Sequence, residues 1–146
     1  MRGPSAKFIS QRDVMGCGIA CVAMLVGASY ATVKRDFAQG MGSNHDLNTE
    51  GTTSKDIRRL LATYGLVMGT FRRLPKLRDK QKQVLKGLAN RCIVRTRTQA
   101  DGSWHWLLYS DDLDGLADPE LNRDGKRKKS IGRVLTGYYP IEEKAQ

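Results

Sequence analysis

The sequence predicts an α+β fold in which an N-terminal helical half packs on a C-terminal antiparallel sheet. Apolar residues recur at helical spacing through the first half of the chain. Later, short alternating segments separated by turn residues are typical of antiparallel strands. The length of 146 residues suits one compact domain. We therefore expect a single domain over residues 1–146, with its folded core at about residues 8–141.

The first elements follow from apolar patterning. Residues 1–10 have the pattern of a tail or an edge strand. From residue 16 to about residue 27, apolar side chains cover most of a helix circumference, which predicts a helix buried on nearly all sides. Residues 30–39 predict an amphipathic helix, and the turn-rich residues 40–51 predict a loop.

The next helix is marked by its N-terminal cap. Thr53 to Asp56 has the form of a capping box, and Gly65 is a natural helix end. A short strand is expected at 67–74 and a third amphipathic helix at 78–89.

The second half predicts a meandering sheet. Alternation predicts strands at 91–99 and 103–110, joined by the Asp-Gly turn at 101–102. Another short strand enters Asp118-Pro119, a basic loop or hairpin tip follows at 122–133, and a final strand begins near residue 135.

Composition excludes several classes of protein. The longest apolar stretch, Ile19 to Ala28, is too short to span a bilayer, and the N-terminus lacks the pattern of a signal peptide. We expect a cytoplasmic chain, or one delivered elsewhere as part of a larger protein. The net charge of +10 is uneven, because residues 55–97 carry 13 basic and 2 acidic groups. That segment suggests an acidic or nucleic-acid-associated substrate.

The three cysteines, Cys17, Cys21 and Cys92, are an odd number, which argues against a disulfide scaffold. A zinc site is not favoured, because Cys17 and Cys21 lack a two-residue spacing and His45 and His105 lie far apart in sequence. No metal or organic cofactor is expected.

Cys17 stands between two glycines where the first helix should begin. A helix N-terminus and a nearby imidazolium both favour a nucleophilic thiolate. Gly16 and Gly18 leave room for a substrate to approach the backbone closely. Gln11 lies in the preceding segment, and its amide can donate to a developing oxyanion together with the Cys17 N–H.

His105 is the candidate general base. If Trp104 and Trp106 face one side of their strand, His105 faces the other. Asp118 ends the next expected strand, thirteen residues later, where a hairpin would bring it beside His105 to orient the ring.

These residues together resemble a known family. The pattern Gln-x5-Cys-Gly-x-Ala-Cys-x-x-Met from Gln11, then His105 before an apolar strand, then Asp118-Pro119, is similar to the papain-like peptidase domains that head bacteriocin-exporting ABC transporters. Those domains cut leader peptides after a double glycine. The resemblance extends from about residue 11 to residue 140. It departs at Gly16, where the family often has an acidic residue, and no transporter is attached.

The resemblance implies a papain-like cysteine peptidase. Cys17 matches the nucleophile, His105 the general base, Asp118 the residue that orients the histidine, and Gln11 the oxyanion donor. Cys21 matches a second, structural cysteine in the same helix. The implied substrate is a protein or peptide with small residues before the cleaved bond, such as Gly-Gly.

The biological setting is open to several interpretations. Free-standing papain-like domains also occur as the toxin domains of interbacterial effectors. We therefore favour an antibacterial toxin acting in the target-cell cytoplasm. A cognate immunity protein is then an expected partner. The alternatives are leader processing in trans, or deamidation or acyl transfer with the same triad. An alternative of another class is an inactive basic module that binds nucleic acid, which is disfavoured because no binding motif is recognisable.

The other polar residues have plainer interpretations. Cys92 is expected to be a strand-core thiol and His45 a solvent-facing loop residue. Asp111, Asp112 and Asp114 have the pattern of a solvated turn, with a weak cation site as the less favoured function. Residues 125–129, Gly-Lys-Arg-Lys-Lys, are expected to be a solvated loop, or else a docking site for an acidic surface.

Overall fold

The computed structural model describes residues 7–41, 46–47, 50–88 and 91–143, so His45 and the first residues of the expected N-terminal tail lie outside the described residues. The described part contains four α-helices: α1 (Cys17–Val26), α2 (Tyr30–Met41), α3 (Ser54–Thr63) and α4 (Arg78–Lys86). It also contains six strands: β1 (Leu66–Met68), β2 (Arg72–Arg73), β3 (Cys92–Thr96), β4 (Trp106–Ser110), β5 (Gly115–Ala117) and β6 (Leu135–Glu143), with a 3₁₀ turn at Asp111–Leu113. The predicted α+β class is confirmed.

The sheet is antiparallel, and its longest strand, β6, pairs with three other strands. The strand order is β1-β6-β3-β4-β5, and β2 also pairs with β6. One edge of β6 therefore receives β1 and β2 in succession, and its other edge receives β3. β3 and β4 form the predicted hairpin, in which Gly102 adopts a φ of 86° that favours glycine.

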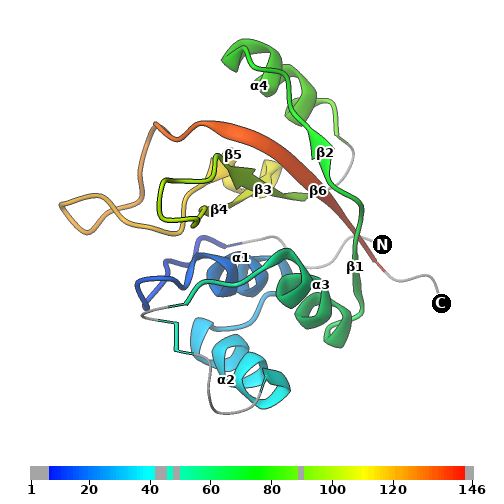
Figure 1. The fold of residues 1–146 in the computed structure, drawn as a ribbon, viewed down its shortest axis with the longest axis vertical. Coiled ribbons are helices and arrows are strands. Elements are labelled where there is room, and N and C mark those ends of the chain that lie inside the picture. The colour runs from blue at the N-terminus through cyan, green and yellow to red at the C-terminus, as the bar shows by residue number, and fades with distance from the viewer. Residues whose placement is uncertain (1–6, 42–45, 48–49, 89–90, 144–146) are drawn as a thin grey trace.

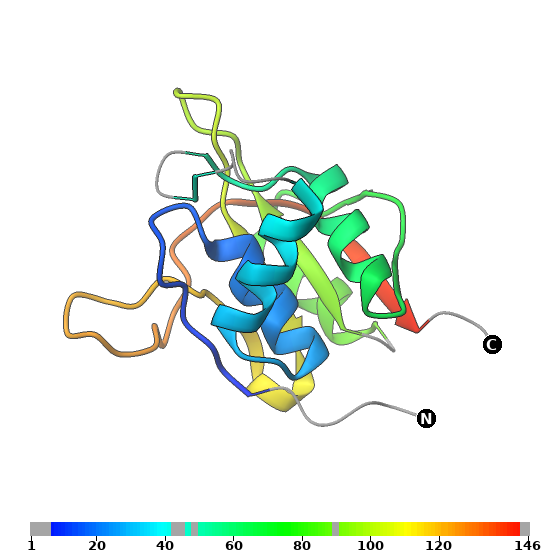
Figure 2. The same ribbon diagram turned by 90° about the horizontal axis from the view of Figure 1, so that it is seen from below.

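Helices cover both faces of the sheet (Figure 1). Because side chains alternate along a strand, each central strand contributes to two apolar clusters. The first cluster lies between the sheet and helices α1, α2 and α3, which stand in front of the sheet in Figure 2. The second cluster lies under α4. Neighbouring residues of the strands divide between the two clusters: Ile93, Leu108 and Tyr139 enter the first, and Val94, Leu107 and Tyr138 enter the second.

Helix α1 is the centre of the first cluster. Every residue from Cys17 to Leu25 is buried, as the all-round apolar pattern predicts. The predicted capping box of α3 is also present, since Thr53 Oγ1 accepts from Asp56 N and Asp56 Oδ2 accepts from Thr53 N.

Two predicted strands differ from the structure. The strand expected at 67–74 is split into β1 and β2, because it runs past Pro140 of β6, which has no N–H to continue the ladder. Gly69 makes the one available bond there, from its N–H to the Pro140 carbonyl at 2.7 Å. The strand expected from residue 103 begins only at Trp106, so His105 immediately precedes β4.

Among the described residues, no single helix has the length and hydropathy needed to cross a membrane. Helix α1 and most of α2 meet that test only as a pair bent by 112°.

Candidate active site

Cys17 is the first residue of α1, at the N-terminus where the sequence predicts it. Its side chain is at the boundary between the helical layer and the sheet. The Sγ atom accepts a hydrogen bond from the backbone N–H of Trp106 in β4 at 3.3 Å. As the first helical residue, Cys17 also has a backbone N–H that the helix itself leaves unpaired.

The glycines on either side of Cys17 are needed for helix packing, and the expected approach of a substrate to their backbone stays a prediction. A Cβ at Gly16 would collide with the Tyr30 hydroxyl. A Cβ at Gly18 would collide with Thr52 Oγ1 and crowd the side chains of Ile57 and Trp106. These contacts press the start of α1 against α2, α3 and the sheet, and they fix the position of the thiol between the two glycines.

His105 is held by its backbone and by both ring nitrogens. Its N–H donates to Thr96 Oγ1 at 2.8 Å, and its carbonyl accepts from Thr96 N at 3.1 Å. Its Nε2 lies 2.6 Å from Asp118 Oδ1, which leaves Nδ1 as the ring nitrogen for the side-chain hydrogen bond with Cys17. The structure therefore brings Asp118, His105 and Cys17 together in that order.

The electrostatics of His105 favour its protonated form. Burial lowers the pKa of His105, but hydrogen bonds with Asp118 and Cys17 outweigh burial and raise the pKa to about 9. An imidazolium therefore faces the thiol at neutral pH, which is the charge state that supports a thiolate–imidazolium pair.

Asp118 is buried and tightly coordinated. Its Oδ1 accepts from His105 and from Glu120 N, and its Oδ2 accepts from Arg133 Nε at 2.9 Å and Lys128 Nζ at 3.3 Å. Burial raises the pKa of Asp118, but its hydrogen bond to His105, the His105 charge and the bond to Arg133 hold it well below its usual range. Asp118 is thus an anion over the whole neutral range.

The basic segment after Asn122 is not only a solvated loop, contrary to the sequence expectation for residues 125–129. Lys128 pairs with Asp118 and Glu120, and Arg127 donates to the Leu113 carbonyl and lies over the Phe8 ring at 5.1 Å. Sequence reasoning missed both Lys128 and Arg133 as partners of Asp118. No local pattern marks them, because the contacts depend on how an irregular loop folds back across ten to fifteen residues.

The backbone of Gln11 lies beside Asp118, but its side-chain amide donates to the loop that leads into α1. Its backbone N–H donates to the Pro119 carbonyl at 2.9 Å, which fixes the N-terminal segment beside Asp118. Its side-chain Nε2 donates to the carbonyls of Val14 at 2.9 Å and Asp13 at 3.3 Å. In this conformation both amide hydrogens are engaged with the loop that leads into α1.

Three buried polar atoms around the triad have no hydrogen-bond partner among the described residues: Gln11 Oε1, Thr52 Oγ1 and Trp104 Nε1. Thr52 lies against Gly18, and Trp104 precedes His105 in sequence and packs edge-on against Trp106. Unpaired buried polar groups are rare in folded proteins and destabilise them. Their side chains are buried beside Cys17 and His105.

The other cysteines and the acidic turn remain outside the triad. Cys21 and Cys92 are fully buried, as expected; burial raises the pKa of the Cys21 thiol strongly and that of Cys92 to about 12. Asp111, Asp112 and Asp114 are exposed around the 3₁₀ turn. Within the described residues, no three His, Cys, Asp or Glu side chains are arranged to hold a metal ion.

Comparisons of the sequence with known protein families and with curated proteins gave no match. The chemical capability of the site therefore has to be judged from its geometry.

Proposed function

We propose that this chain is a papain-like cysteine endopeptidase in which Cys17 is the nucleophile, His105 the general acid and base, and Asp118 the residue that orients His105. The observation that carries the proposal is the continuous contact from Asp118 through His105 to Cys17, at the N-terminus of a buried helix. A structural thiol needs neither a protonated histidine beside it nor a buried carboxylate behind that histidine.

Acylation in the proposed mechanism begins from a thiolate–imidazolium pair of Cys17 and His105. The Cys17 thiolate attacks the peptide carbonyl carbon, and the S–C bond forms as negative charge develops on the carbonyl oxygen. The unpaired Cys17 N–H can donate to that oxygen, and Gln11 can donate as well if its longer bond, the 3.3 Å bond to the Asp13 carbonyl, is released. When the C–N bond breaks, the leaving nitrogen takes the proton of the His105 imidazolium.

Deacylation returns the site to its starting state. Neutral His105 takes a proton from water as the water oxygen attacks the thioester carbonyl. The C–S bond breaks, the acid product leaves, and the thiolate–imidazolium pair is restored. Asp118 stays ionised throughout and supports each return of positive charge to His105.

A polypeptide is the substrate class that the family resemblance implies. Cleavage after small residues such as Gly-Gly, and action as an antibacterial toxin with an immunity protein, remain predictions that come from the family resemblance.

The first test compares growth and protein fragments in bacteria that express the chain. The wild type, Cys17→Ala and Cys21→Ala are expressed in the cytoplasm at matched soluble levels, and new protein N-termini are identified by mass spectrometry. Cys21→Ala is the matched control, because it removes a thiol from the same helix without touching the triad. We expect new N-termini, preceded by small residues, with the wild type and Cys21→Ala only.

The other outcomes separate the alternatives. Growth arrest that depends on Cys17 supports the toxin setting, and cleavage without arrest supports leader processing. A mass change of about one dalton without new N-termini indicates deamidation. Equal toxicity of the wild type and Cys17→Ala would contradict an enzymatic role for the thiol and favour the basic nucleic-acid-binding module.

A further inference from the structure

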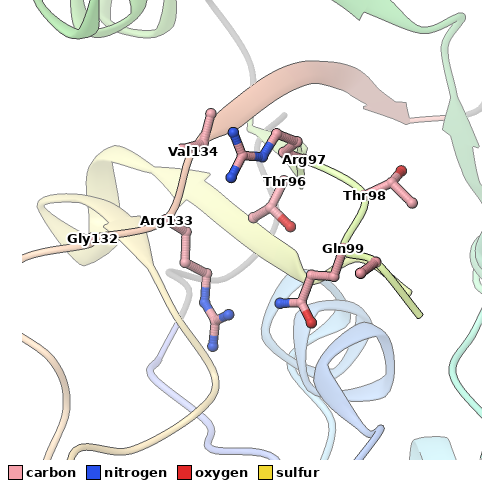
Figure 3. A pocket seen from close by; sticks show the side chains of 8 residues that line it. Thr96, Arg97, Thr98, Gln99, Gly132, Arg133 and Val134 are labelled. Atoms are coloured by element: carbon pink, nitrogen blue, oxygen red, sulfur yellow. The ribbon is translucent and has the colours of Figure 1, made fainter. Parts of the chain in front are cut away.

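A pocket with a volume of about 560 Å³ lies beside the His105–Asp118 pair. Its walls come from the end of β3 and the following β3–β4 connection, residues 96–100, and from the segment that enters β6, residues 132–134. Figure 3 shows Arg133 and Gln99 on opposite sides of this pocket, with Thr96 between them. This volume is in the range of pockets that bind small molecules or side chains.

The pocket is coupled to the triad through two of its wall residues. Thr96 exchanges two hydrogen bonds with the His105 backbone, at 2.8 and 3.1 Å. Arg133 donates from Nε to Asp118. A group bound in the pocket is therefore close to the general base and on the sheet side of the site.

The charged side chains on the pocket wall are both cationic. Two guanidinium groups, the hydroxyls of Thr96 and Thr98 and the amide of Gln99 supply the polar surface, while no carboxylate lines the pocket. The nearest acidic side chain of the hairpin, Asp101, accepts instead from Ser103 N and Oγ. Such a wall is complementary to an anion.

The two arginines differ in how far the protein already neutralises their charge. Arg133 is engaged through Nε with Asp118 and through Nη2 with Glu120, which satisfies both carboxylates. Arg97 is exposed, and its guanidinium has no ion pair or hydrogen bond among the described residues. With Lys128 and protonated His105, the pocket and its neighbours have four cationic groups against two carboxylates. The exposed guanidinium of Arg97 is the part of this positive charge that a ligand can reach.

We propose that this pocket is a subsite for an acidic side chain, Asp or Glu, of the polypeptide substrate near the cleaved bond. The proposal rests on the proposed peptidase function and specifies its substrate class. Arg97 is the residue that distinguishes an acidic side chain from a neutral one, because its charge is not already neutralised by the protein. A carboxylate also fits the planar donors of a guanidinium in bidentate geometry.

The test uses quenched fluorescent peptides that share one Gly-Gly core and carry Glu, Gln or Lys, scanned through the flanking positions. We measure kcat/KM for the wild type, Arg97→Gln, Arg97→Glu and Arg78→Gln. Arg78 is a matched control, because it is an exposed arginine on α4, which covers the opposite face of the sheet from Cys17. At one position we expect Glu to be preferred over Gln by about fivefold at low salt, the effect of one exposed ion pair.

The preference should disappear in Arg97→Gln, favour Lys in Arg97→Glu, and persist in Arg78→Gln. Arg97→Gln should lower cleavage of the Glu peptide more than cleavage of the Gln peptide, whereas Arg78→Gln should lower neither. Equal cleavage of the Glu and Gln peptides at every position, or a preference that survives Arg97→Gln, would overturn the subsite.

A binding measurement separates this proposal from the catalytic one. The Glu and Gln peptides are titrated into Cys17→Ala, with and without Arg97→Gln, and followed by fluorescence anisotropy. Arg97-dependent binding of the Glu peptide without cleavage by the wild type would support the subsite and contradict the peptidase. Absence of both would overturn both.

Discussion

At the scale of single residues, His105 divides its two ring nitrogens between two partners. Nε2 is committed to Asp118 at 2.6 Å, so Nδ1 is the atom that would exchange protons with Cys17 in the proposed mechanism. The pairing with a fully buried carboxylate also sets the charge state of the ring, since Asp118 keeps its negative charge through neutral pH. One hydrogen bond thereby fixes both the orientation and the protonation of the base.

The pKa of His105 predicts the basic limb of activity. Because the pKa is raised to about 9, His105 stays protonated at neutral pH, and kcat/KM should fall only as the pH rises through about 9. Asp118→Asn removes the carboxylate that raises this pKa, so the limb should move to lower pH. A pH profile of peptide hydrolysis checks this, and an unmoved limb in Asp118→Asn would contradict the assignment.

The two pKa shifts also contribute to stability, and the two contributions depend on pH in opposite directions. The raised pKa of His105 contributes stability that is fully present below its ordinary value of 6.5 and lost as the pH rises through about 9. The lowered pKa of Asp118 contributes stability that is present above its ordinary value of 3.8 and lost at more acidic pH.

Gln11 offers a second prediction at this scale. Loss of one oxyanion donor typically lowers kcat by about 10²-fold or more, so Gln11→Ala should lower kcat by about that factor with little change in KM. Stopped assays at saturating peptide check this. If kcat is unchanged, the amide only ties Asp13 and Val14 to the loop, as its present hydrogen bonds show.

At the scale of elements, the start of α1 is placed by close packing rather than by a side-chain cap. Its N-cap is Gly16, and no side chain caps the helix there. The neighbours of Gly16 and Gly18 come from three different elements and the loop before α3, so the thiol is located by the convergence of the whole helical layer on the sheet.

This packing predicts opposite effects for two glycine substitutions. Gly18→Ala should lower the free energy of unfolding by about 1–3 kcal/mol, because its Cβ overlaps Thr52 and crowds Trp106. Gly40→Ala in α2 should raise it by about 0.5–1 kcal/mol, since nothing lies within 4 Å of the new Cβ. Urea unfolding measures both, and equal effects would contradict the packing role of Gly18.

The loop between β5 and β6 predicts a separate effect through Arg133, a positioning residue. Arg133→Gln should lower the free energy of unfolding by about 1–3 kcal/mol, because buried Asp118 loses a charge-assisted hydrogen bond. It should also move the basic limb to higher pH, since removal of a nearby cation favours the His105 imidazolium.

Lys129→Gln is the control for this change, as Lys129 is exposed in the same loop and has no ion pair among the described residues. A merely structural role for Arg133 would lower stability and leave the pH profile unmoved.

The elements that the sequence predicts well are those with a local signal. The apolar run after Cys17 and the capping box at Thr53 each identify a helix end. The hairpin length places Asp118 beside His105 because strand pairing converts spacing into proximity. The fold of the loop from Asn122 to Arg133 and the rotation of the Gln11 amide have no local signal, because both are decided by contacts that form only in the folded chain.

At the scale of the whole molecule, the candidate site lies between the helical layer and the sheet, which share the first apolar cluster. Cys17 belongs to the helical layer, while His105 and Asp118 belong to the sheet layer. Trp106 lies at their junction, where its N–H contacts Cys17 Sγ and its indole N–H donates to the Thr52 carbonyl at 2.8 Å. Docking of the layers and assembly of the triad are therefore one event.

This coupling predicts coincident transitions in urea. Tryptophan fluorescence, loss of peptidase activity and alkylation of buried Cys92 should share one midpoint. Leu85→Ala, which removes a side chain from the cluster under α4, should lower the free energy of unfolding by about 2–5 kcal/mol while kcat in native buffer stays unchanged. Loss of activity at lower urea than loss of fluorescence would show that the triad opens independently.

The pairing of β6 with three other strands also affects the order in which the molecule folds on the ribosome. Cys17 is synthesised long before His105, and the strand that joins β1, β2 and β3 is made after both. Domains acquire their structure as the chain emerges from its N-terminus. In this sheet, β1, β2 and β3 have no common partner strand until β6 has emerged. Under the proposed function, the nascent chain carries its thiol through translation before His105 is in place, and peptidase activity is expected only after β6 has been released.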